Sequence, residues 1–239
     1  MRVDLIKDLS FIKSQVHHNL LADILQKAIS DEEISGVMLC GSFARGDANE
    51  GSDLDIYIVL KNDYNRSFYA ETKHGILIEI KYANVEKARE KLRLNSMEVY
   101  NYIDGNILYD SEGLLEGLSN YAMECFHDYK SKPKDKRETS HWLKSSKIKI
   151  QAAFQAGDVL KASFVVSTSS YKILEAFWLI NNMPMPPNGG VLTHLKDLKV
   201  GSSYLEKWKE DLFLGSNEVR ISTALEMIDF VTPFLEQED

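Results

Sequence analysis

The sequence has few cysteines and no long apolar run. Only Cys40 and Cys125 are present, which are too few for a disulfide scaffold and are not spaced as metal ligands. No stretch approaches the ~20 apolar residues that a membrane-spanning helix needs. The N-terminal segment MRVDLIKDLS carries acidic residues and lacks the apolar core of a signal peptide. These absences predict a cytoplasmic protein without a membrane partner.

Basic residues are outnumbered by acidic ones. The 239-residue chain has 28 Lys and Arg against 36 Asp and Glu, which gives a formal net charge of −8. Proteins that bind a nucleic-acid backbone usually carry excess positive charge, so this balance argues against a nucleic-acid partner. A polycationic small molecule would instead be attracted to an acidic cleft. With 44% hydrophobic and 27% charged residues, the composition is that of a globular protein with one large domain or two smaller ones.

The most informative segment is a strand, a turn and a second strand. Residues 37–40 are apolar and are followed directly by Gly41 and Ser42. Glycine lets the backbone approach a phosphate closely, and amide and hydroxyl groups at a following helix start can bind phosphate oxygens. The second strand carries Asp53 and Asp55, whose side chains share one face because side chains alternate along a strand. The alternative is a pair of exposed acids at a strand end with no function.

A third acid follows in an apolar segment. Residues 75–82, GILIEIKY, are predicted to form a strand by their β-branched content, and Glu79 is the acid among them. Burying a lone charge is costly, so such an acid is usually paired, unless it lies at a strand edge in water. Together Asp53, Asp55 and Glu79 could hold two metal ions ~4 Å apart for a phosphoryl displacement. Mg²⁺ is the expected ion because it favours carboxylate and phosphate oxygens.

The remaining patterns predict an α+β fold in which a small mixed sheet is packed by helices. The expected strands are residues 36–41, 53–60, 68–73 and 75–82. Asn84 and Ser111 are predicted to be the N-caps of two helices that follow the strands.

The N-terminal segment has helical periodicity. An apolar stripe that starts with Leu5 and Leu9 predicts a packing helix over residues 3–29. His17 and His18 are adjacent, so on a helix they diverge by about 100° and cannot easily share a metal ion. We expect both to be ordinary residues of the helix surface.

The second half of the chain is predicted to be helical throughout. Residues 130–137, KSKPKDKR, contain a proline in a run of charge with little that could pack, and form the predicted linker. The expected domains are therefore residues 1–130 and an all-helical bundle of residues 131–239. Residues 159–180 are apolar on most sides and are the expected central helix of that bundle.

These residues resemble a known family. Gly41-Ser42, ten further residues, Asp53-Leu54-Asp55 and a later strand acid are similar to the signature of the DNA polymerase β-like nucleotidyltransferase superfamily. Residues 77–82, residues 107–113 and the helical second half resemble the kanamycin nucleotidyltransferase type more closely.

The resemblance implies an adenylyltransferase that moves AMP from ATP, the nucleoside triphosphate, to a hydroxyl of a small molecule such as an aminoglycoside antibiotic. Residues 1–130 would be the nucleotidyltransferase domain, and residues 131–239 the substrate-binding and dimerisation domain of a homodimer. The implied catalytic residues and Mg²⁺ ligands are Asp53, Asp55 and Glu79, and the implied nucleotide-binding residues are Gly41, Ser42, Arg45 and Lys147. For Arg45 an ion pair with Asp47 is the alternative, and for Lys147 a solvated surface position.

The sequence departs from the kanamycin type at one point. That family has a general-base glutamate on the first helix of the second domain, where this chain has Ser140, His141, Trp142 and Leu143. The base would then be Glu79 or another acid, or the acceptor differs. Two alternatives therefore stay open: an adenylyltransferase that modifies a protein partner, as in toxin–antitoxin pairs, and a non-catalytic nucleotide-binding module.

Overall fold

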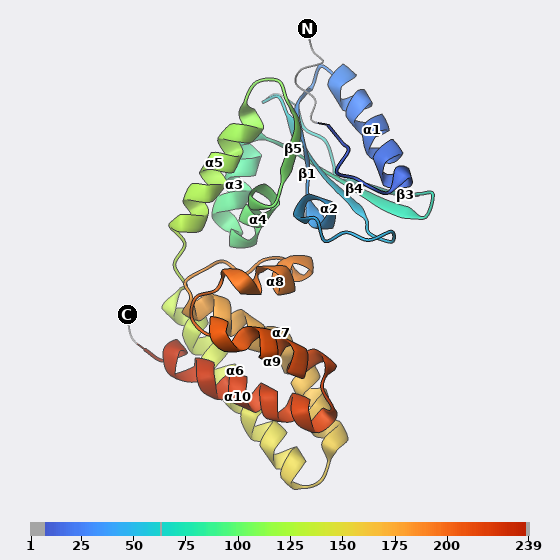
Figure 1. Cartoon of the computed structure of the whole chain (residues 1–239). Coiled ribbons are helices and arrows are strands. Elements are labelled where there is room, and N and C mark those ends of the chain that lie inside the picture. The colour runs from blue at the N-terminus through green and yellow to red at the C-terminus, as the bar shows by residue number, and fades with distance from the viewer. Residues whose placement is uncertain (1–7, 63, 238–239) are drawn as a thin grey trace. The chain divides into compact units, whose positions relative to one another are not determined.

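The structure is a computed structural model that describes residues 8–62 and 64–237 (Figure 1). The contacts divide the chain into two compact units, of which the first ends at Asp128 and the second begins at Tyr129. Within the described residues, no helix combines the length and the apolar character needed to cross a membrane.

The first unit is built on a mixed sheet with helices, as predicted from the sequence, and within the described residues the sheet has five strands rather than the four expected. Its strands are β1 (Ile34–Leu39), β2 (Leu54–Leu60), β3 (Tyr69–Lys73), β4 (Ile76–Asn84) and β5 (Asn106–Asp110). Their order in the sheet is β3-β4-β2-β1-β5. β2 and β4 are parallel neighbours, whereas the other pairs are antiparallel. The two central parallel strands bring together segments that are well separated in sequence.

Helices cover both faces of this sheet (Figure 1). α1 (Gln15–Ser30) covers one face, and α3 (Val85–Leu94), α4 (Val99–Ile103) and α5 (Leu114–His127) cover the other, with a short 3₁₀ turn, η2 (Ser96–Glu98). The short helix α2 (Gly41–Arg45) lies at the end of the sheet, directly after β1. Ile56 and Ile58 of β2 belong to the apolar cluster under α1, whereas Tyr57 and Val59 belong to the cluster under α3, α4 and α5. By this alternation Asp55 lies on the α3–α5 face.

The predicted N-terminal helix is longer than the observed one. Leu5 lies outside the described residues, and α1 begins only at Gln15. Leu9 and Ile12 nevertheless remain buried, at 8% and 5% exposure, in the cluster under α1. An apolar residue every third or fourth position here reflects burial of a non-helical segment, which periodicity alone cannot distinguish from a helix.

One predicted cap is confirmed and one is wrong. Asn84 Oδ1 accepts a hydrogen bond from Lys87 N at 3.0 Å and caps α3. Ser111 does not cap α5, because its hydroxyl donates to the Ser35 carbonyl oxygen at 3.0 Å. The carboxylate of Asp110 instead accepts from the first amides of α5 at 2.9 and 3.0 Å.

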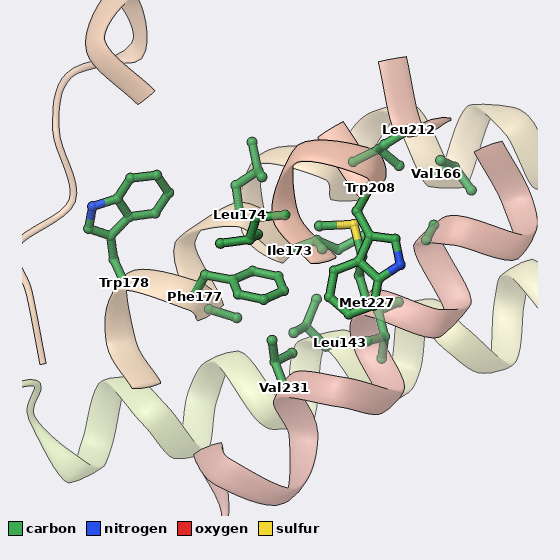
Figure 2. Packing of buried hydrophobic residues seen from close by; sticks show 14 of the residues in the cluster. Leu143, Val166, Ile173, Leu174, Phe177, Trp178, Trp208, Leu212, Met227 and Val231 are labelled. Carbon is green, nitrogen blue, oxygen red and sulfur yellow. The ribbon is translucent and has the colours of Figure 1, made fainter. Parts of the chain in front are cut away.

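The second unit is a helical bundle. Its helices are α6 (Pro133–Gln155), α7 (Val159–Ile180), α8 (Asn188–His194), α9 (Ser202–Leu214) and α10 (Asn217–Leu235), with a 3₁₀ turn, η3 (Leu195–Asp197). α7 packs against both α6 and α10, as expected for a central helix. Figure 2 shows Phe177 of α7 and Trp208 of α9 within the core, with ring centroids 6.0 Å apart.

The basic segment predicted as a linker is mostly helical. Pro133 is the first residue of α6, a position that suits proline because its fixed φ matches the helix and its missing N–H is not needed. Lys136 is only 6% exposed, so this run contributes packed residues as well as solvated charge.

Candidate active site

The three predicted acids converge on one face of the sheet. Asp55 of β2 lies opposite Glu79 of β4 in the parallel ladder, and Asp53 comes just before β2. One carboxylate oxygen from each acid lies within 4.8 Å of the corresponding oxygens of the other two. All three side chains are partly buried. The arrangement depends on strand register, since a shift by one residue would move an acid to the opposite face.

The charges in this cluster oppose one another. Burial raises the pKa of the Asp55 carboxyl above its ordinary value, and the nearby carboxylates of Asp53 and Glu79 raise it further. The cationic side chains of Lys81 and Arg45 act on the Asp55 pKa in the opposite direction. Complete ionisation of the cluster is therefore unfavourable unless a cation joins it.

The donor set fits Mg²⁺. Three carboxylates provide only oxygen ligands, and partial exposure leaves room for water or phosphate oxygens to complete the shell. The cluster can therefore hold a divalent ion.

Gly41 brings the turn after β1 into direct contact with Asp55. Its φ of +65° lies in the left-handed region that favours glycine. A Cβ at this position would lie 2.2 Å from Asp55 Oδ2, so no other residue fits without movement of the acid. The amide of Cys40 also donates to the Asp55 backbone oxygen at 2.8 Å. The turn and the acidic cluster thus form one site.

Ser42 offers an unused donor at this turn. Its Oγ is buried and, among the described residues, has no hydrogen-bond partner. Buried hydroxyls are normally paired, so an orphaned one beside an acidic cluster indicates a place where a ligand oxygen would bind.

Each of the two basic residues predicted to bind the nucleotide forms an ion pair with an acid. Arg45 lies at the end of α2 and pairs with Asp47, with Nε 3.1 Å from Oδ2, which is the alternative considered from the sequence. Lys147 lies on α6 in the helical unit and forms an ion pair with Asp229. A nucleotide contact by Lys147 stays a prediction.

The acids near the predicted base position of α6 have other partners. Glu138 pairs with Lys134 at 3.7 Å, and Asp158 caps α7 by accepting from Lys161 N at 3.0 Å. Ser140 Oγ donates to Glu236 Oε1 of the C-terminal segment at 2.8 Å.

The prediction that His17 is a surface residue is wrong. His17 is 1% exposed and forms hydrogen bonds with Ser14 and Ser52. The available signal was its position three and four residues before Leu20 and Leu21, which places it on the buried face of α1.

Lys81 is a basic residue near the acidic cluster that was not predicted from the sequence as a site residue. It follows Glu79 by two residues on β4, so both side chains point to the same face.

One family model matches part of the chain. Residues 21–105, about a third of the chain, match the family described as the nucleotidyltransferase domain. The match includes the Gly41 turn and all three acids. The protein is a nucleotidyltransferase, an enzyme whose substrate is a nucleoside triphosphate.

The solved structures that match the chain include a nucleotidyltransferase-like protein from Exiguobacterium sibiricum, with 13% sequence identity and a TM-score of 0.43. The similarity covers 90% of this chain and 74% of that chain. No curated protein matches the chain.

Proposed function

We propose that the protein moves AMP from ATP to a hydroxyl of a small molecule, of which an aminoglycoside-like antibiotic is the leading candidate. The observation that carries this proposal is the convergence of three carboxylates within 4.8 Å, in contact with a glycine-serine turn. The net charge of −8 is consistent with a polycationic acceptor.

In this reaction the acceptor oxygen bonds to the α-phosphorus while the bond from that phosphorus to the bridging oxygen breaks, and pyrophosphate leaves. Mg²⁺ held by Asp53, Asp55 and Glu79 would neutralise the charge that develops on the phosphate oxygens. Ser42 Oγ would donate a hydrogen bond to a phosphate oxygen, and Gly41 would let the backbone approach it. Positioning supplies most of the rate in such a transfer.

The proton of the acceptor hydroxyl must pass to a base. Glu79 is the proposed base because it belongs to the acidic cluster, whereas Glu138 of α6 pairs with Lys134. The helical unit, residues 131–239, is proposed to bind the acceptor and a second copy of the chain, as the resemblance implies. Sedimentation velocity over a range of protein concentrations would detect or refute the homodimer.

The test is pyrophosphate release with Mg²⁺, ATP and a panel of antibiotics. We expect release with at least one acceptor and a loss of ~100-fold or more in Asp53→Asn. Asp128→Asn, which changes an exposed acid at the end of α5, is the matched control and should keep full activity. Silence across the panel would refute the antibiotic acceptor.

A protein acceptor is the second candidate function. The observation that favours it is the engagement of Glu138 and Asp158 in other contacts, so the base arrangement of the kanamycin type is missing. Incubation of α-labelled ATP with co-expressed proteins would then label a protein band and no antibiotic.

A further inference from the structure

His17 contacts three segments of the first unit at once. Its Nε2 lies 2.8 Å from the Ser52 carbonyl oxygen, and its Nδ1 lies 2.7 Å from Ser14 Oγ. The ring packs on Phe43 of α2, with the ring centroids 4.6 Å apart. The side chain is 1% exposed, so these contacts are made away from solvent.

The partners determine where the proton of the ring lies. A carbonyl oxygen can only accept, so Nε2 carries a hydrogen and donates it to Ser52. In the neutral ring Nδ1 is then an acceptor, and the Ser14 hydroxyl donates to it. The hydrogen bonds therefore run in one direction from Ser14 through His17 to Ser52.

The segment that His17 holds ends at one of the acids. Ser52 is the neighbour of Asp53, and the β2–β4 ladder begins only after it, at Leu54. The turn before Asp53 also has hydrogen bonds of its own: Ser52 N donates to the Asn49 oxygen at 3.1 Å, and Asn49 N donates to Ser52 Oγ at 2.9 Å. The hydrogen bond from His17 joins this turn to α1. Asp53 therefore lacks the ladder support that the other two acids have.

The same ring also supports the phosphate side of the site. Phe43 directly follows Ser42 on α2, and the contact with His17 fixes the inner face of that short helix. The buried side chain of His17 thus contacts both the turn before Asp53 and the helix that begins with Gly41 and Ser42.

We propose that His17 is a positioning residue for nucleotidyl transfer, which holds the Asp53 carboxylate in place for the metal ion. His17 itself is not one of the three clustered acids. The inference rests on the proposed metal-binding role of the three acids. If His17 only filled the core, loss of its ring would lower stability, and loss of its hydrogen bond to Ser52 would leave metal binding unchanged.

Two substitutions separate these roles. His17→Phe keeps an aromatic ring against Phe43 but removes the donor to Ser52, whereas His17→Gln keeps an amide donor and loses the ring. The probe is Mn²⁺ alone, with binding followed by electron paramagnetic resonance and unfolding by thermal melts without metal. His18→Phe is the matched control, since His18 is the half-buried next residue of α1 and makes none of these bonds.

We expect His17→Phe to weaken Mn²⁺ binding by about tenfold, the lower end of the effect of residues that orient metal ligands. His17→Gln should bind more tightly than His17→Phe, and His18→Phe should bind as the wild type does. Ser14→Ala removes only the hydrogen bond from Ser14 to His17 and should weaken Mn²⁺ binding less. This variant replaces His17→Phe in the test if His17→Phe does not fold.

Two results would overturn the inference in distinguishable ways. If His17→Phe and Ser14→Ala melt at lower temperature but bind Mn²⁺ like the wild type, His17 is a packing residue and the metal site stands without it. If the wild type itself binds no Mn²⁺, the proposed metal role of the acids fails, and the positioning role fails with it.

Discussion

Substitution of Gly41 by alanine should separate backbone strain from disruption of the site. The added Cβ would lie 2.2 Å from Asp55 Oδ2, well inside a normal contact, so the carboxylate must retreat by about 1 Å. A displacement of about 1 Å in a reacting constellation costs ~100-fold in rate. Alanine at a φ of +65° also costs ~1–2 kcal/mol of folding free energy. We therefore expect a modest loss of stability and a large loss of activity.

Gly46 provides the matched control for this prediction. It has a φ of +83°, but a Cβ there would meet nothing within 4 Å. Gly46→Ala should lose a similar free energy of unfolding and keep its activity. Denaturant melts measure the loss of free energy of unfolding caused by the strain. Mn²⁺ binding and pyrophosphate release measure whether the site still binds metal and is active. Equal activities of Gly41→Ala and Gly46→Ala would refute the contact between the turn and Asp55.

Three further predictions concern charge and packing. Because the pKa of Asp55 is raised in the fold, the folded protein binds more protons than the unfolded chain, so stability without metal should fall as pH rises through the raised pKa; Asp55→Asn should remove this slope in urea melts. Arg66 bridges two carboxylates at 2.5 and 2.7 Å while 30% exposed, so Arg66→Gln should cost about 1 kcal/mol, and less in high salt. Phe177→Ala should cost ~3–5 kcal/mol, whereas Phe164→Ala, at an exposed position, should change the free energy of unfolding by less than ~0.5 kcal/mol.

The part of the site that could be predicted follows from local rules. Strand alternation places Asp53 and Asp55 on one face, and β-branched content marks the strand of Glu79. Those rules do not give the parallel register that sets Asp55 opposite Glu79, because pairing between distant segments is decided by the assembled sheet. The catalytic roles of these residues, and those of Ser42, Arg45 and Lys147, stay predictions.

The errors occurred where tertiary contacts override local pattern. His17 is a polar residue that the core accepts because Ser14 and Ser52 satisfy both ring nitrogens. Ser111 is a suitable cap residue, but its hydroxyl donates to the Ser35 oxygen, and the carboxylate of Asp110 accepts from the first amides of α5. Ser52 and Ser35 are distant in sequence from His17 and Ser111, so these partners could not be identified from spacing.

The parallel pairing of β2 and β4 also determines when the acidic site is assembled during folding. The β3–β4 hairpin closes a short loop, whereas the contact of β2 with β4 needs a longer and slower closure. Asp55 and Glu79 therefore meet only when the middle of the sheet has assembled. We expect newly made chains to capture divalent ions late, after the hairpin is already protected from hydrogen exchange.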